Sequence, residues 1–305
     1  MRAIGLAALL ITSAAFADQP LPLPPVQGAE LTQPPPDQRA ARAHVAFAPQ
    51  RYDDILWEND RTAHRIYGPA LQVHEPPSGS GIDAWGKRVA WPFMERQLAT
   101  GHQHDYHGEG LDFYNVGGSR GGGGLGIWYD HKLWTSRNWQ QYHILRDGPD
   151  RADFTVDYAA WPVDVLRRVW EHRRFVLPLG SNFTRISSTI GSDKPGMMLV
   201  GIGLASHPTD GGKGRLVADR AHGRFTFWSP EDPEKGAMGT ALIVDPAQIA
   251  EVTEDADNYL VVLKVRPGHR FAYYMGATWS RAGQFADSKA WEAEVAAQKA
   301  DFTAP

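Results

Sequence analysis

The sequence has no cysteine among its 305 residues, and this absence excludes several kinds of site and of stabilisation. Disulfide bonds cannot cross-link the fold, and thiolate metal sites and cysteine nucleophiles are ruled out. The fold must therefore depend on a hydrophobic core, and a chain of this length can bury a large one.

Basic tracts are also absent, and the formal net charge is -4. We therefore expect no nucleic-acid partner, because nucleic-acid binding usually needs a concentrated positive surface. No stretch beyond the first residues is apolar enough to cross a bilayer, so we expect no membrane partner either. The sequence carries no signal for an oligomeric state.

The N-terminus is typical of a secretory signal peptide. Arg2 supplies one positive charge, residues 3–11 form an apolar run, and Ala15-Phe16-Ala17 is a small-x-small cleavage signal. The apolar run is too short for a membrane span. We therefore expect residues 1–17 to be removed, and the mature protein to be periplasmic or secreted from a bacterium.

A proline-rich spacer and one folded domain are expected after the signal. Residues 18–41 contain seven prolines, which indicates an extended, disordered segment. Residues 42–305 consist of short stretches in which apolar and polar residues alternate, the period of half-buried strands. Strands are expected over residues 44–48, 54–59, 62–67, 152–158, 165–177, 182–190, 197–206, 223–228, 241–245, 259–266 and 270–279.

Helix is expected only near residues 95–100 and after Asp287, a plausible N-cap, where Trp291, Val295 and Phe302 lie near one helical face. These patterns predict an all-β fold. They favour one large antiparallel β-sandwich with a short C-terminal helix.

Residues 101–126 depart from the strand pattern, because ten of these 26 residues are glycine. We interpret the segment as a permissive surface loop of the kind that carries functional sites. Its ionisable and aromatic side chains are the candidate catalytic residues. They are His102, His104, Tyr106, His107, Glu109 and Asp112.

Three uses of this cluster stay open. Elimination on a uronate sugar needs a base, an acid and a cation for the carboxylate, which histidine, tyrosine and arginine supply. Glycoside hydrolysis needs two carboxyls, for which Glu109 and Asp112 are candidates. The third use is a divalent metal ion held by His102, His104 and His107; otherwise no cofactor is predicted.

Candidate substrate-binding residues follow the loop and continue on a later strand. Arginine pairs bidentately with carboxylates and tryptophan stacks on sugar rings, so an acidic carbohydrate is the expected partner. The alternative for the later strand is a solvated surface whose charges pair across a hairpin. The candidates are Arg120, Trp128, Arg137, Trp170, His172 and Arg174.

Four motifs resemble the bacterial domain-of-unknown-function family numbered 4861. They are ILWENDRTAHRIYGP at residues 55–69, HGEGLDFY at 107–114, GSRG at 118–121 and GIW at 126–128. The resemblance extends from about Arg51 to Arg281. It implies a fold close to the galactose-mutarotase-like supersandwich, and secreted proteins encoded among enzymes for pectin and other uronate-containing polysaccharides. It brings no assigned catalytic residues.

The leading hypothesis is an enzyme that cleaves uronate-containing, pectin-type oligosaccharides by elimination or hydrolysis. One alternative is a binding module without turnover that presents Trp128, Trp134 and Trp170 to a glycan. Another is a sugar epimerase or mutarotase, which would change the configuration of a sugar and cleave nothing.

Overall fold

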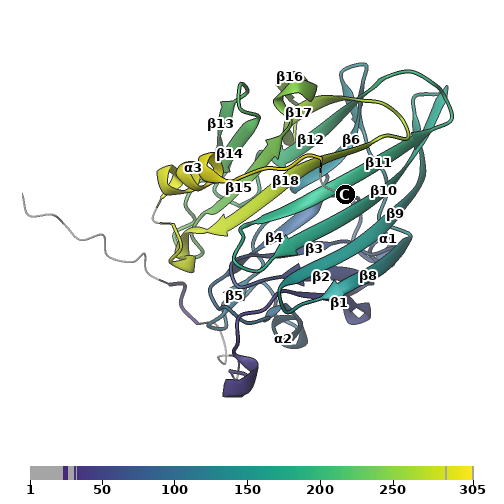
Figure 1. Cartoon of the computed structure of the whole chain (residues 1–305). Coiled ribbons are helices and arrows are strands. Elements are labelled where there is room, and N and C mark those ends of the chain that lie inside the picture. Colours follow the sequence, from purple (N-terminus) through teal and green to yellow (C-terminus); the bar gives the residue numbers. More distant parts are fainter. Residues whose placement is uncertain (1–22, 27–30, 32, 286, 304–305) are drawn as a thin grey trace, which may run out of the picture.

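Alternating apolar residues along the strands produce two layers of antiparallel sheet that pack face to face (Figure 1). The computed structural model describes residues 23–26, 31, 33–285 and 287–303. The expected signal peptide, residues 1–17, lies outside the described residues, and the expected spacer is described only in part.

One layer is a single eight-stranded sheet with the order β13-β14-β15-β18-β11-β10-β9-β8. Its strands are β8 (Gln141–Asp147), β9 (Arg151–Val163), β10 (Arg167–Pro178), β11 (Phe183–Ser192), β13 (Arg215–Asp219), β14 (Arg224–Trp228), β15 (Met238–Val244) and β18 (Arg270–Trp279). Hairpins join β9 to β10 and β10 to β11. This long meander makes the rigid wall against which the other layer packs.

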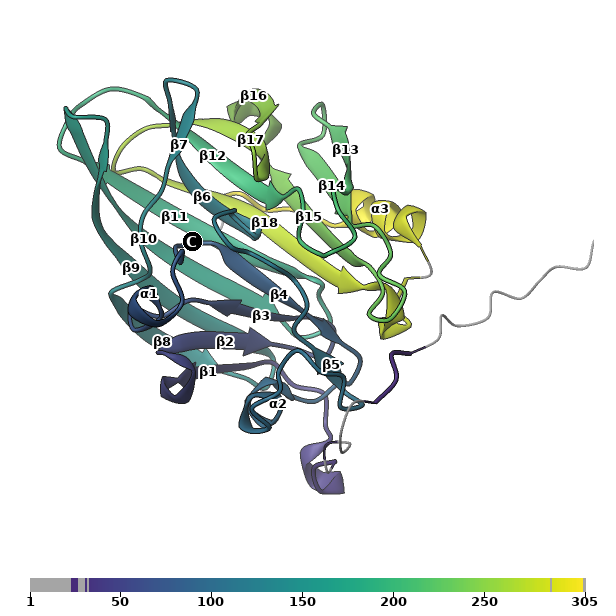
Figure 2. The same cartoon turned by 180° about the vertical axis from the view of Figure 1, so that it is seen from behind.

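The second layer consists of two five-stranded sheets, ordered β1-β2-β3-β4-β5 and β16-β17-β12-β6-β7 (Figure 2). The first contains β1 (His44–Ala48), β2 (Asp54–Glu58), β3 (Ala63–Ile66), β4 (Ile82–Lys87) and β5 (Gly110–Leu111). The second contains β6 (Gly122–Tyr129), β7 (Lys132–Trp134), β12 (Met198–Ala205), β16 (Ile249–Glu254) and β17 (Asn258–Val265). A parallel bridge between Ile82 and Gly121 links them.

Helices are short and lie outside the two layers. They are α1 (Leu71–His74), α2 (Met94–Ala99) and α3 (Ser288–Ala297), with 3-10 turns at Pro36–Gln38, Pro49–Arg51, Pro246–Gln248 and Ser280–Ala282. None of the helices in the described part of the chain is long and apolar enough to span a membrane.

The main core lies between the layers and contains residues from both. The Trp57 ring of β2 lies 5.3 Å from Phe154 and 5.2 Å from Phe175, ring centre to ring centre. Its indole nitrogen donates to the Thr184 hydroxyl at 3.1 Å, so the polar atom of this buried ring is satisfied. Every second residue of β2 therefore faces the core, and the residues between them face outward.

The predicted fold class is confirmed: the protein is mostly strand, in large antiparallel sheets with one helix near the C-terminus. That helix begins as expected, because the Asp287 side chain accepts a hydrogen bond from the Ala290 amide. Trp291 and Val295 are buried on the outer face of the eight-stranded sheet, where Trp291 stacks on Phe183.

The prediction of a surface loop over residues 101–126 is wrong for residues 122–126, which begin the buried strand β6. The glycines there serve close packing. A Cβ atom on Gly124 would lie 2.6 Å from the Ser80 carbonyl oxygen and 2.8 Å from that of Arg120. Only glycine lets these backbones approach so closely, so a run of glycine marks a crowded strand at this position.

Candidate functional site

The outer face of the β1–β5 sheet carries charged side chains beside a small apolar cluster, unlike the face that meets the core. Strand pairing places Leu56, Arg65 and Asp83 side by side on neighbouring strands, all pointing away from the core. The segment from β4 to β6 covers this face and buries it. The sheet therefore carries charged side chains in a place without bulk water.

Arg65 is the centre of this polar face. Its Nη2 donates to Asp83 at 2.6 Å and to Asp112 at 2.9 Å, and its Nε donates to Asp83 at 3.0 Å. Nη1 lies 3.7 Å from a carboxylate oxygen of Asp54. The guanidinium also lies over the rings of Tyr67 and Trp85, at 5.2 and 5.3 Å from their centres.

Three carboxyl groups thus surround one cation, and all four groups are buried. Burial raises the pKa of Asp54 to about 7, although Arg65 opposes the shift. Burial and the neighbouring charge of Asp83 raise the pKa of Asp112 to about 8. One guanidinium cannot balance three carboxylates in a medium of low dielectric constant, so the cluster retains protons near neutral pH.

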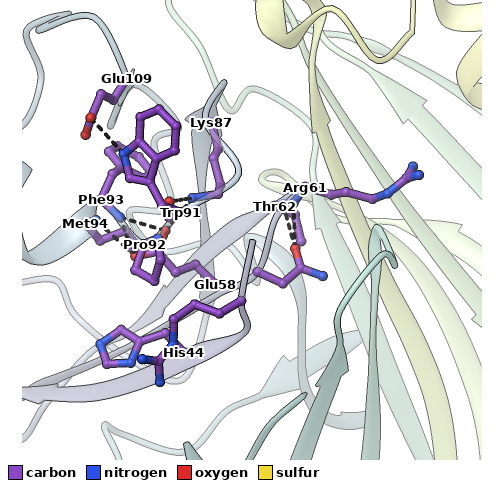
Figure 3. Close-up of polar contacts among 12 residues, drawn as sticks. His44, Glu58, Arg61, Thr62, Lys87, Trp91, Pro92, Phe93, Met94 and Glu109 are labelled. Atoms are coloured by element: carbon purple, nitrogen blue, oxygen red, sulfur yellow. Dashed lines mark hydrogen bonds and ion pairs between the residues drawn. The ribbon is translucent and has the colours of Figure 1, made fainter. Parts of the chain in front are cut away.

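Glu58 fixes the covering segment to the sheet (Figure 3). Its carboxylate accepts hydrogen bonds from the Phe93 and Met94 amides, both at 3.0 Å, at the start of α2. It also pairs with Lys87 at 2.6 Å, and Lys87 donates to the Trp91 carbonyl oxygen at 2.7 Å. These contacts hold residues 91–94 in place over β2 and β4.

Glu109 also helps to hold the covering segment in place. Its carboxylate accepts from the Trp91 indole at 2.9 Å, as Figure 3 shows, and forms a short ion pair with Arg96 of α2. Glu109 is buried and lines neither of the cavities described next. Its contacts are those of a residue that ties α2 to the strand β5.

A cleft with two lobes lies beside the covering segment. Cavities of about 320 and 210 Å³ share Arg51, Glu75, Gln103 and His104 in their walls. Gln50, Tyr52, Leu98 and Gly101 complete the larger lobe. The smaller lobe reaches Arg65, Tyr67, Asp112 and Tyr114. The cleft is therefore floored by the Arg65 cluster and walled by the segment that follows α2.

His104 stands where the two lobes meet. Its Nδ1 lies 2.9 Å from the Asp112 carbonyl oxygen, which can only accept a hydrogen bond, so Nδ1 carries the proton. Nε2 lies 3.3 Å from the Gln103 amide nitrogen, which can only donate, so Nε2 is the acceptor in this contact. The ring is 65% exposed, and the Asp112 carboxylate lies 3.7 Å from Nδ1. His104 is thus an accessible base that its neighbours orient.

Arg51 brings a positive charge to both lobes. Its Nη2 pairs with Glu75 at 2.9 Å and its Nε donates to Gln103 at 3.2 Å. Nη1 has no hydrogen-bond partner among the described residues. Nη1 is buried, so Arg51 contributes its positive charge to the cleft through its place in the wall of both lobes.

The family model described as "Domain of unknown function (DUF4861)" matches residues 24–305. The chain belongs to the DUF4861 family. It is 33% identical over 267 residues to "Uncharacterized protein P7" of Formosa agariphila, a match that covers 81% of this chain and 64% of that protein. The chain thus spans less than two thirds of the length of this relative.

A solved structure is also similar to this DUF4861 protein at a low level. It is the galactosidase domain of alpha-galactosidase-sucrose kinase, AgaSK, with a TM-score of 0.35 and 9% sequence identity. The similarity covers 77% of this chain and 42% of that chain. It carries no argument about the reaction.

The six predicted catalytic residues do not form one cluster. His104 and Asp112 line the cleft, whereas Tyr106 is buried against Trp279 and donates to the Gly108 carbonyl oxygen. His102 is exposed outside both lobes, and the buried His107 places its Nε2 3.3 Å from the His102 carbonyl oxygen.

The predicted alternative of a metal ion held by three histidines does not fit this arrangement. Within the described residues, no group of three or more histidine, aspartate or glutamate side chains is placed to hold a metal ion. His104 and His107 instead face separate backbone carbonyl groups.

The predicted substrate-binding residues lie away from the cleft. Arg120 is buried and donates to the Ser80 hydroxyl at 3.2 Å and the Gly118 carbonyl oxygen at 3.0 Å. Trp128 lines a different cavity, and Arg137 is exposed on the segment after β7. None of them lines either lobe of the cleft.

The candidates on β10 do share one face, as their alternation predicted, but it is the outer face of the eight-stranded sheet. This is the opposite side of the sandwich from the cleft. His172 pairs with Asp157 at 2.7 Å and Arg174 pairs with Asp153 at 2.7 Å, both across the β9–β10 hairpin. Trp170 is half-exposed beside them.

Sequence reasoning missed most of the cleft. Arg51, Arg65, Tyr67 and Gln103 were not candidates. A signal was present for Arg65, because it occupies an outward position on a strand whose neighbours carry charges at outward positions. Alternation alone predicts only a half-buried strand. The acidic partners of Arg65 cannot be identified without the strand register.

The raised pKa of Asp112 should make stability depend on pH. Because the folded state holds this proton more tightly than the unfolded state, the free energy of unfolding should fall by up to about 1.4 kcal/mol per pH unit up to pH 8. Urea denaturation between pH 6.5 and 8 should show a smaller decline for Asp112→Asn than for the wild type. Asp54, whose pKa is also raised, His44 and His64 are present in both proteins, so the comparison isolates the part of the slope that depends on Asp112. Equal slopes would contradict the assignment.

Removing Glu58 should loosen the covering segment. Glu58→Ala leaves Lys87 without its counter-ion and two amides without their acceptor, so we expect a loss of about 3–5 kcal/mol in the free energy of unfolding. Glu254, which forms an exposed pair with Lys213, is the control, and Glu254→Ala should have no measurable effect. Equal stabilities of the two variants would show that the Glu58 contacts contribute little.

Proposed function

We propose that this DUF4861 protein is an exported enzyme that acts on uronate-containing oligosaccharides at the cleft. The observation that carries the proposal is His104, an accessible imidazole whose Nδ1 is held by a backbone carbonyl group, at the junction of two lobes that Arg51 also lines. Removing a proton next to a sugar carboxylate needs such a base, together with a cation for the carboxylate.

Each reacting group has a candidate in the cleft. His104 Nε2 takes the proton alpha to the carboxylate, and Arg51 pairs with that carboxylate. Asp112 retains a proton near neutral pH and lies 3.7 Å from His104 Nδ1. It gives this proton to the leaving oxygen, and the carboxylate that results stabilises the imidazolium formed when His104 takes the proton from carbon.

The two lobes favour an oligosaccharide over a single sugar. Their volumes, about 320 and 210 Å³, are each on the scale of one sugar ring, and His104 lies in the wall of both. A substrate with one ring in each lobe would hold its glycosidic bond close to the base. Elimination then breaks the bond to the ring that leaves.

Hydrolysis has weaker support. It requires two carboxyls on either side of the bond, and Glu109 is held by Arg96 and Trp91 outside the cleft. Epimerisation is the second candidate, because it begins with the same proton abstraction alpha to the carboxylate. The products separate the two reactions: elimination creates an unsaturated ring, and epimerisation changes only configuration.

Variants of the two neighbouring histidines test the site. His104→Gln should lower turnover of uronate oligosaccharides about 10²–10⁴-fold, the range for loss of a general base, with little change in stability. His102→Gln, which alters an exposed ring outside the cleft, is the matched control and should keep its activity. Absorbance of unsaturated uronates and the masses of the products give the readout. An active His104→Gln enzyme, or a wild type that converts none of a broad panel, would refute the proposal.

Export is part of the proposal and rests on the N-terminal sequence. Protein recovered from the periplasm or the medium of a bacterial host should begin at Asp18, as determined by N-terminal sequencing. Recovery of the intact N-terminus in the cytoplasm would contradict export.

A further inference from the structure

A second cavity lies at the end of the sandwich where the β6–β7, β9–β10 and β11–β12 turns gather (Figure 2). Its volume is about 600 Å³, within the range of small-molecule sites, and it shares no lining residue with the cleft. Ile127, Val163 and Met198 are buried in its wall, beside Trp128. The interior of the cavity is therefore mainly aliphatic and aromatic.

The mouth of this cavity is apolar as well. Leu166 is 72% exposed and Met197 is 55% exposed, and both line the cavity. Val165, next to Leu166 at the hairpin tip, is 96% exposed. Large aliphatic side chains gathered at one opening are uncommon on soluble proteins and indicate that something apolar binds there.

Two cations stand at the same opening. Arg167 and Lys194 line the cavity, and neither forms an ion pair within the described part of the chain. Arg167 donates to the Pro195 carbonyl oxygen at 3.2 Å. The one acidic residue of the wall, Asp164, uses its carboxylate to accept the Leu166 amide and so closes the turn. With two cations and one carboxylate, the wall of the cavity carries a net positive charge.

We propose that this cavity binds a monomeric anionic amphiphile, with its acyl chain against Ile127 and Met198 and its anionic head between Arg167 and Lys194. The apolar interior accounts for the chain and the two cations for the head. This site is independent of the cleft, and its occupancy does not depend on the proposed enzyme activity.

Titration with 11-(dansylamino)undecanoic acid below its micelle concentration tests the site. The wild type should bind it saturably, and Leu166→Asp and Met197→Asp should each weaken binding at least tenfold. Leu145→Asp is the matched control, since Leu145 is an equally exposed aliphatic residue on β8 outside the cavity, and it should bind like the wild type. No saturable binding, or equal losses in all three variants, would overturn the proposal.

The charge of the head is tested separately. The double variant Arg167→Glu, Lys194→Glu should weaken binding of the acid at least tenfold and change binding of its methyl ester less than twofold. Equal losses for acid and ester would overturn the role of the cations. Sedimentation with phosphatidylglycerol vesicles should leave the protein in solution, and binding to vesicles without binding of the monomeric probe would overturn the choice of a monomeric ligand.

Discussion

The ion cluster around Arg65 is the interaction on which the candidate site depends. One guanidinium joins β2, β3 and β4 through Asp54 and Asp83, and reaches the covering segment through Asp112. The backbone carbonyl group of Asp112 in turn orients His104. The position of an exposed imidazole is thus set by charges buried beneath it. A residue that must present one nitrogen to a substrate needs this kind of support from rigid elements.

Charge holds the covering segment to the sheet at two places, the Arg65 cluster and the Glu58–Lys87 pair. Burying charges costs desolvation energy, so such pairs are a weak source of stability, and apolar contacts such as Phe93 against Trp85 must contribute as well. The ion pairs fix the position of the covering segment on the sheet, because a buried charge without its partner is strongly unfavourable. The segment is therefore fixed where Asp112 meets Arg65 and Lys87 meets Glu58, and that arrangement shapes the cleft.

Much of the fold could be predicted from the sequence, because alternation reports which residues face a core. It identified β1, β2, β10 and β18 and the capped C-terminal helix. The cleft could be predicted only through His104 and Asp112. Its other residues depend on which strands pair and on what covers them, and a linear pattern contains neither. The glycines at residues 122–126 led to the prediction of a loop where β6 begins. Glycine permits tight packing of strands as well as open loops, so its presence alone does not separate the two.

The cleft combines an acid and a base of unusual placement. Ordinarily a carboxyl group is the stronger acid and is ionised at neutral pH, and an imidazole beside it would hold the proton. Here burial raises the pKa of Asp112 to about 8, while Nδ1 of His104 donates to the Asp112 carbonyl group and Nε2 faces the Gln103 amide. A carboxyl group with a raised pKa therefore lies beside an imidazole whose orientation is fixed. Reactions that remove a proton from carbon and return one to oxygen require an acid and a base, which is why we propose elimination rather than hydrolysis at the cleft.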